Sequence, residues 1–254
     1  MECMLSKLAD AMAIRNFEIP RQGNSDEQPF NGFASGDVRA RTSGQTLNLN
    51  EQTREETIRL VRQVFFSGHS RPQVVVFAGV EHGSGCTWIC ARAADMLAAH
   101  LDGLVCLVDA DLRSPSLHRH FEIETSSSIV NEEFLSAPVR QPVPRPGGPN
   151  LWLLSCETQR ADSQGFERLR SRVTELRKEF DYILIDAPPI NSHADATLLG
   201  GVADGLVMIL EANDTRREAA VRAKETLHAA GVPLLGAVLN RRTFPIPEKL
   251  YRKL

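Results

Sequence analysis

The 254-residue sequence lacks three features that would each point to a function class. It has no excess of positive charge, since 29 Lys and Arg residues stand against 32 Asp and Glu residues, a formal net charge of -3. Proteins that bind nucleic acid usually carry a basic stripe, so we expect no nucleic-acid partner. No apolar run reaches the roughly 20 residues that span a bilayer, and the first 15 residues carry scattered charges where a signal peptide would be apolar. We therefore expect a cytoplasmic protein.

The sequence also lacks the CxxC spacing of metal and redox sites. Its cysteines are Cys3, Cys86, Cys90, Cys106 and Cys156, and three of them lie in otherwise apolar segments. Small buried hydrophobic residues are the simplest use for such cysteines. We expect reduced thiols, without disulfides or a metal site.

The chain divides into a polar N-terminal part and one main domain. Residues 2–15 could form a short amphipathic helix, and residues 16–50 are rich in Gly, Ser, Asn, Gln and Arg, which is typical of a flexible linker. A content of 42% hydrophobic residues is sufficient for one buried core. We expect a short N-terminal helix plus flexible linker over 1–50, one main domain over 51–245 and a C-terminal tail over 246–254.

Strand and helix patterns alternate through the domain. Apolar runs predict strands at 73–79, 104–111, 151–156, 182–189, 205–212 and 233–240. Amphipathic patterns predict helices at 55–66, 87–100, 166–180 and 215–230, the last ending before Gly231. Short, nearly all-apolar strands that alternate with helices are typical of an α/β fold with a mostly parallel sheet flanked by helices.

Polar residues follow three of these strands, at the edge where such folds bind ligands. The first strand runs into a glycine-containing turn, "GVEHGSGCT", which precedes a helix and could direct backbone N–H groups at an anion. The second strand ends at Asp109, Ala110 and Asp111, and the fourth ends at Asp186. Thr87 has the position to ligate Mg²⁺ on a bound triphosphate, and Asp186 to hold the same ion through water. Each signal alone also has a structural explanation as a turn or a helix cap, but their coincidence favours a nucleotide site.

Several segments together resemble the bacterial tyrosine kinases (BY-kinases) of capsule and exopolysaccharide synthesis. "LVDADLRSPSLHRHF" resembles the second acidic motif of that family, "FDYILIDAPP" resembles its Walker B motif, and Glu56, Arg59 and Arg62 match its oligomerisation motif. The similarity covers about residues 51–245 and extends to the wider MinD and ParA type P-loop ATPases.

The resemblance implies roles for individual residues and for partners. Asp109, Asp111 and Arg113 would form the catalytic group, with Asp109 as the base that accepts the tyrosine proton. Thr87, Asp111 and Asp186 would bind Mg²⁺. ATP would be bound by Gly83, Ser84, Gly85, Cys86, Thr87 and Asn240, with Asn240 at the adenine edge. The expected partners are other copies of the chain and a membrane chain-length regulator, a polysaccharide co-polymerase on a separate polypeptide that would recruit the protein to the inner face of the plasma membrane.

The sequence departs from this family at the phosphate loop and in its tyrosines. Cys86 occupies the position of the loop lysine, and a neutral thiol is a poor substitute for a charged donor. The N-terminus of a helix can lower a cysteine pKa, so redox sensing by Cys86 is a hypothesis beside that of a tolerated loss. The family's tyrosine cluster is also missing, because the chain has only Tyr182 and Tyr251, and Tyr251 is the one plausible phosphoacceptor in the tail.

Three functions follow as alternatives. The first is an ATP-binding tyrosine autokinase that regulates exopolysaccharide or capsule polymerisation and export, with impaired catalysis. The second is a pseudokinase scaffold without phosphoryl transfer, and the third is a MinD or ParA type ATPase switch. The third is disfavoured by Glu81, which stands where those ATPases carry an additional lysine.

Overall fold

The computed structural model describes residues 51–67, 71–101, 103–121, 139–144, 150–155 and 163–241. The predicted N-terminal helix and linker and the predicted tail with Tyr251 lie outside these residues. All of the described residues lie within the main domain predicted over 51–245.

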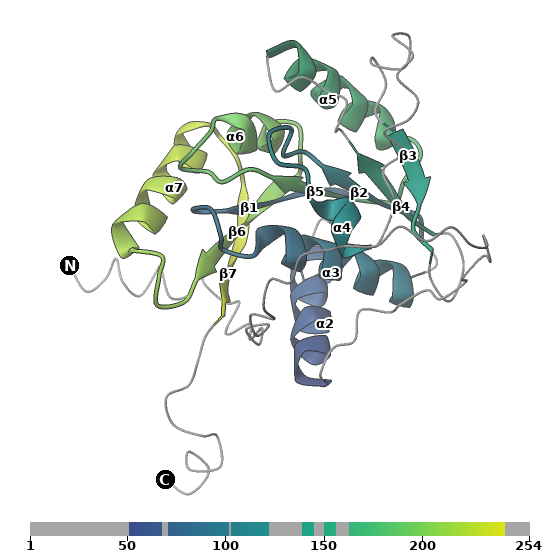
Figure 1. Ribbon diagram of the computed structural model, residues 1–254, viewed down its shortest axis with the longest axis horizontal. Coiled ribbons are helices and arrows are strands. Elements are labelled where there is room, and N and C mark those ends of the chain that lie inside the picture. Colours follow the sequence, from purple (N-terminus) through teal and green to yellow (C-terminus); the bar gives the residue numbers. More distant parts are fainter. Residues whose placement is uncertain are drawn as a thin grey trace, which may run out of the picture.

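A seven-stranded sheet forms the centre of the described residues, in the order β3-β4-β2-β5-β1-β6-β7 (Figure 1). The strands are β1 (Val74–Gly79), β2 (Val105–Asp109), β3 (Val139–Pro142), β4 (Leu151–Ser155), β5 (Tyr182–Ala187), β6 (Gly205–Glu211) and β7 (Leu234–Asn240). All neighbouring strands are parallel except β3, which pairs antiparallel with β4 at one edge. The six predicted strands are confirmed, and β3 is an additional strand that the sequence analysis missed.

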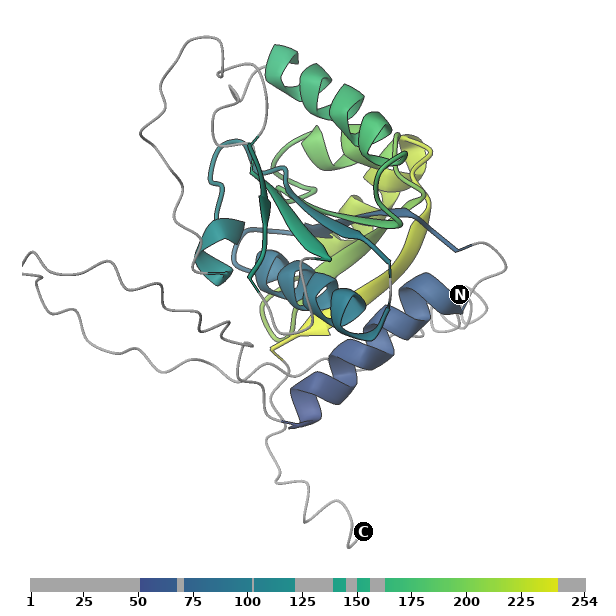
Figure 2. The ribbon, with the colours of Figure 1, turned by 90° about the vertical axis from the view of Figure 1, so that its right-hand side faces the viewer.

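Helices cover both faces of the sheet (Figure 2). They are α2 (Glu51–Phe66), α3 (Cys86–His100), α4 (Leu117–His120), α5 (Ser163–Leu176), α6 (Asp195–Gly200) and α7 (Arg217–Ala229). One hydrophobic core contains residues of α2, α3 and α4, and the other contains residues of α5, α6 and α7. The four predicted helices are confirmed, whereas the short helices α4 and α6 were not predicted.

The apolar sequence of β1 explains why both cores form. Val74 and Val76 belong to the core on the α5–α7 side, and Val75 and Phe77 to the core on the α2–α3 side. Successive side chains of a strand point to opposite faces, so a strand covered by helices on both faces must be apolar at every position. All six residues of β1 are buried.

An ionic anchor ties elements together at the amino ends of the central strands. Asp204 accepts hydrogen bonds from the backbone N–H groups of Gln73 (2.7 Å) and Val74 (2.8 Å), and Arg177 pairs with it at 2.9 Å. Burial acts to raise the pKa of Asp204, but the bonds from Arg177, Val74 and Gln73 outweigh it and hold the pKa below the ordinary value. At the edge of the sheet opposite the phosphate loop, Asp204 is thus paired with Arg177 and with the backbone at the start of β1.

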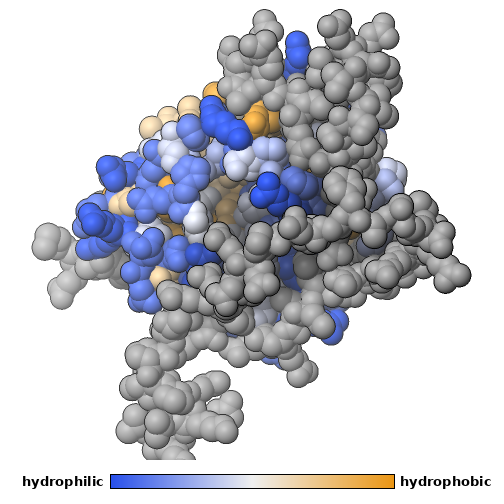
Figure 3. Space-filling model, viewed as in Figure 1, coloured by the Kyte–Doolittle hydropathy of each residue, from blue (hydrophilic) through white to orange (hydrophobic). Residues whose placement is uncertain are grey.

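The described surface in Figure 3 is mainly hydrophilic, with hydrophobic spots near α6. Large hydrophobic side chains with substantial exposure are few and scattered: Leu104, Leu198, Val221, Leu234 and Leu235. None of the described helices is both long and apolar enough to cross a membrane.

Candidate functional site

The loop between β1 and α3 has the conformation that its glycines permit. Gly83 and Gly85 have φ angles of 86° and 79°, in the left-handed region that other residues rarely adopt. Gly85 also lies against Asn240, whose amide nitrogen would be only 2.4 Å from an added Cβ atom. Both glycines are therefore required by the turn itself.

The helix that follows the loop begins without a side-chain cap. Gly85 is the N-cap residue of α3, no side chain accepts a hydrogen bond there, and the first turn contains no acidic residue. The first N–H groups of a helix have no partner within it and carry the positive end of the helix dipole. This arrangement suits a bound anion such as phosphate.

Two carboxylates lie side by side where β2 and β5 end. Asp109 and Asp186 are register partners in the β2–β5 pair, and each is 2% exposed. Oδ2 of Asp109 accepts backbone hydrogen bonds from Ser116 and Leu117, each at 2.9 Å. The Oδ1 atoms of Asp109 and Asp186 are buried without a hydrogen-bond partner. Since buried polar atoms are nearly always paired, these two oxygens fit a ligand that brings positive charge.

Burial changes the proton affinity of both carboxylates. It raises the pKa of Asp186 from 3.8 to about 8; the charge of Asp109 adds to the rise, and hydrogen bonds from Thr87 and Cys86 oppose it. Burial also raises the pKa of Asp109 from 3.8 to about 6, although the hydrogen bonds from Leu117 and Ser116 lower it. At neutral pH without a ligand, Asp186 therefore holds its proton and Asp109 has largely lost its own.

Cys86 is a protonated thiol. It is partly exposed, but burial of the thiol raises its pKa well above 9.0, and the charge of Asp186 raises it further. The expectation that the helix N-terminus lowers this pKa was wrong, because desolvation and the neighbouring carboxylate dominate. The hypothesis of a reactive redox cysteine loses its main support. The described cysteines, Cys86, Cys90 and Cys106, are free thiols as predicted.

The second acidic motif folds around Asp109 and Asp111. Oδ1 of Asp111 accepts hydrogen bonds from the backbone of Arg113 and Ser114, both at 3.1 Å. The side chain of Arg113 forms an ion pair with Asp195, at the beginning of α6. This ion pair links segments 82 residues apart, and the sequence analysis did not find Asp195.

Asn240 supports the loop from the end of β7. It is fully buried, and its side-chain amide donates a 2.7 Å hydrogen bond to the backbone oxygen of Ser84. Its own Oδ1 accepts from the backbone of Arg241 at 2.8 Å. In this structure Asn240 is a support for the phosphate loop, and its predicted contact with adenine stays a prediction.

Other predicted residues lie away from this edge or outside the described chain. Glu56 and Arg59 form an exposed hydrogen-bonded pair on α2 at 3.0 Å, and Arg62 follows on the same helix. The rings of His82 and His193 lie near each other, with centroids 6.5 Å apart. Within the described residues no cluster of three or more His, Cys, Asp or Glu side chains is arranged to hold a metal ion, so Mg²⁺ would depend on Thr87, water and phosphate as well as on carboxylates.

Comparison with known protein families identifies the family of this chain. The family model described as ATPase MipZ matches residues 73–215, more than half of the chain and the whole segment from β1 to the end of β6. The chain belongs to the MipZ family of ATPases. This MipZ-family chain therefore has the expected MinD/ParA-like P-loop fold.

Individual relatives confirm the resemblance to bacterial tyrosine kinases. The tyrosine-protein kinase YwqD of Bacillus subtilis is 32% identical over 139 residues, which are 54% of the MipZ-family chain and 59% of the kinase. The kinase domain of the Escherichia coli tyrosine kinase ETK has a TM-score of 0.63 at 19% identity, over 77% of this chain and 79% of that domain. The MinC:MinD cell division protein complex of Aquifex aeolicus matches with a TM-score of 0.52 at 23% identity, over 71% and 72% of the two chains. The two structures show the fold alone, and the chain spans about three-fifths of the length of YwqD.

Proposed function

We propose that this protein binds Mg²⁺·ATP at the carboxyl edge of β1, β2 and β5 and acts as a tyrosine-autokinase-like regulator of exopolysaccharide or capsule polymerisation and export, with slow phosphoryl transfer. The observation that carries the proposal is the pair of buried, in-register carboxylates with one unpartnered oxygen each. Burying an ionisable group without a partner costs stability, so a pair of them is best explained by a cation that the folded protein binds.

The residues around the pair suit that cation and the phosphates. Thr87 and Asp186, with Asp111 nearby in the second acidic motif, would hold Mg²⁺, which supplies charge neutralisation for a transferring phosphoryl group. The uncapped first turn of α3 and the backbone of Gly83, Ser84 and Gly85 would bind the phosphates. Asp109, with a pKa of about 6, would be ready at neutral pH to accept the proton of a tyrosine hydroxyl.

Cys86 is the reason to expect slow transfer. A protonated thiol adds no positive charge, whereas a charge-assisted hydrogen bond from lysine contributes about 1.5–3 kcal/mol, or roughly 10- to 150-fold in affinity. Tyr251 is the proposed phosphoacceptor. Glu56, Arg59 and Arg62 are proposed to contact a neighbouring copy, and a membrane chain-length regulator is the proposed partner that recruits the protein to the membrane.

A pseudokinase scaffold is the second candidate, and the state of Cys86 favours it. A third candidate, an ATPase switch, is favoured by the match to ATPase MipZ. Transfer of phosphate from ATP to Tyr251, measured beside ATP hydrolysis, separates the three: a kinase labels Tyr251, a switch only hydrolyses, and a scaffold does neither.

The deciding experiment is calorimetry of Mg²⁺·ATP binding to the wild type and to Cys86→Lys. We expect measurable binding by the wild type and binding tighter by about tenfold or more in Cys86→Lys. An Asp186→Asn variant is the control for the metal site and should weaken Mg²⁺·ATP binding in both backgrounds. If neither the wild type nor Cys86→Lys binds nucleotide, the proposed function is wrong.

A further inference from the structure

The phosphate loop contains neither Lys nor Arg, so a permanent positive charge for a bound triphosphate has to come from another part of the chain. Three nearby groups are already engaged or neutral. The Cys86 side chain cannot carry a positive charge, Arg113 is paired with Asp195, and Nη1 of Arg241 lies 2.9 Å from Oε1 of Glu211. The charge must come from a different residue.

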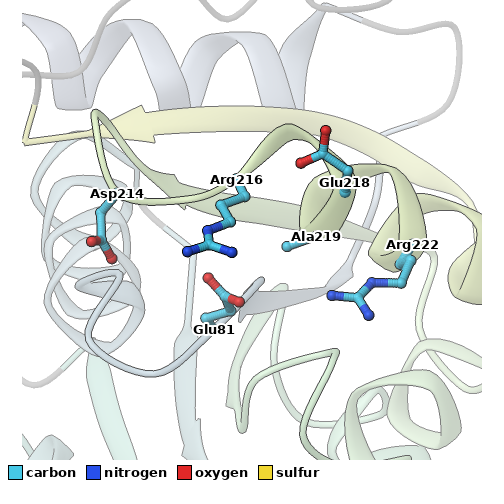
Figure 4. A pocket seen from close by; sticks show the side chains of 6 residues that line it. All are labelled: Glu81, Asp214, Arg216, Glu218, Ala219 and Arg222. Carbon is cyan, nitrogen blue, oxygen red and sulfur yellow. The ribbon is translucent and has the colours of Figure 1, made fainter.

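A cavity of about 760 Å³ lies directly beside the loop (Figure 4). Its lining combines one loop residue with residues after β6 and on the first turns of α7: Glu81, Asp214, Arg216, Glu218, Ala219 and Arg222. Two arginines therefore face the loop across a space large enough for a phosphate group.

Hydrogen bonds hold the two walls of this cavity next to each other. The backbone N–H of Val80, in the loop, donates to the oxygen of Ile209 in β6 at 2.9 Å. The turn after β6 is closed by two bonds between Glu211 and Thr215, at 2.9 Å and 3.0 Å. Arg216 follows this turn directly as the N-cap residue of α7, so its backbone has a fixed position relative to the loop.

The side chain of Arg216 extends toward the loop. In Figure 4 its guanidinium group and the Glu81 carboxylate point at each other from opposite walls of the cavity, while the Glu218 carboxylate is directed elsewhere. Arg216 is exposed and forms no ion pair with any residue in the described part of the chain. Arg222 enters the same cavity from further along α7.

We propose that Arg216 supplies to the terminal phosphates of a bound nucleoside triphosphate the positive charge that the loop lacks at Cys86. The inference rests on the proposed function, since it assigns a binding residue to the same site. A planar guanidinium can donate two parallel hydrogen bonds to one phosphate, and the phosphate takes the place of Glu81 as the group that Arg216 faces. Glu81, Asp214 and Glu218 also line the cavity and make it unfavourable for anions in general, so a phosphate is held there only when the rest of the nucleotide is bound by the loop.

The test is calorimetry of Mg²⁺·ATP and Mg²⁺·ADP binding to Arg216→Ala, Cys86→Lys and the double variant. Arg216→Ala should weaken ATP binding by about tenfold or more, the change expected for loss of a charge-assisted hydrogen bond, and should affect ADP less. The loss should be clearly smaller when Lys occupies position 86, because two cations that serve one phosphate are not additive. Arg216→Lys should retain most of the affinity of the wild type.

Arg217→Ala is the matched control, because it removes the same charge from the neighbouring position, which is exposed and does not line the cavity. Equal ATP affinities of Arg216→Ala, Arg217→Ala and the wild type would overturn the assignment while leaving the proposed function intact. A loss of the same size in the presence and absence of Lys at position 86 would overturn it as well. Absence of ATP binding in every variant, including Cys86→Lys, would instead refute the proposed function. Thermal unfolding of each variant checks that lost binding is not lost folding.

Discussion

Replacement of Asp186 by Asn should make the ligand-free protein more stable at high pH. The burial of Asp186 raises its pKa from 3.8 to about 8, which means that the folded protein opposes ionisation of this carboxyl. Asn has nearly the same shape, cannot ionise, and retains an oxygen that can accept hydrogen bonds from Thr87 and Cys86.

The size of the effect follows from the two pKa values. Below pH 3.8 the carboxyl is protonated in both states, and its contribution to stability is fully present. As pH rises from 3.8 toward 8, the unfolded chain releases a proton that the folded protein keeps, so the folded state loses about 1.4 kcal/mol per pH unit from this group. Between pH 5 and pH 9, the wild type should lose roughly 4 kcal/mol relative to Asp186→Asn.

Urea unfolding at several pH values without Mg²⁺ measures this difference. Trp88 in α3 and Trp152 in β4 are the two tryptophans and provide the fluorescence signal. Asp214→Asn, at an exposed position on the turn after β6, is the control and should follow the pH dependence of the wild type. Parallel curves of free energy of unfolding against pH for wild type and Asp186→Asn would refute the reasoning. Added Mg²⁺ should stabilise the wild type at pH 9 more than Asp186→Asn, since the ion needs the charged carboxylate.

Other substitutions test the loop. Cys86 should react slowly with iodoacetamide at pH 8 because its pKa is raised. Asp186→Asn should make this reaction faster, because it removes a negative charge beside the thiol. Equal reaction rates of wild type and Asp186→Asn, measured by mass spectrometry, would contradict this explanation of the raised pKa. Asn240→Ala should lower the free energy of unfolding by about 1–3 kcal/mol, because the buried oxygen of Ser84 loses its donor, and an unchanged urea midpoint would argue against that support. Gly85→Ala should lower the free energy of unfolding by at least about 1 kcal/mol because of the positive φ at this position. The loss should be smaller in the Asn240→Ala background, because the added methyl group then no longer clashes with the Asn240 side chain. If the losses of the two variants add fully, this contact does not contribute.

Much of the fold could be predicted because the strands are covered on both faces. Runs such as Val74–Gly79 have to be apolar throughout, and so they stand out from the amphipathic helices between them. The strand β3 could not be recognised in the same way, since "VRQP" contains polar residues and a proline, as edge strands often do. The helices α4 and α6 have four and six residues, too few for a helical period to show.

The site was predictable in its components but not in their contacts. The positions of Asp109 and Asp186 at strand ends could be predicted from the sequence, whereas their pairing in register depends on β2 and β5 being neighbours. The pKa of Cys86 was predicted in the wrong direction because its sign depends on Asp186, which approaches only in the folded chain. Arg216 was missed for a similar reason: no motif marks it, and only the β1–β6 pairing brings it beside the loop.

The anchor of Asp204 and Arg177 lies at the end of the sheet opposite the candidate site. The first and sixth strands are linked at their amino ends, while the thiol, the buried carboxylates and the glycine loop all lie at the opposite end. Substitutions in the site, such as Lys at position 86, can therefore change the activity without removing any interaction of Asp204 or Arg177. The two ends of the sheet therefore differ in kind: at the amino end the polar groups are paired within the chain, whereas at the carboxyl end carboxylate oxygens are left for a ligand.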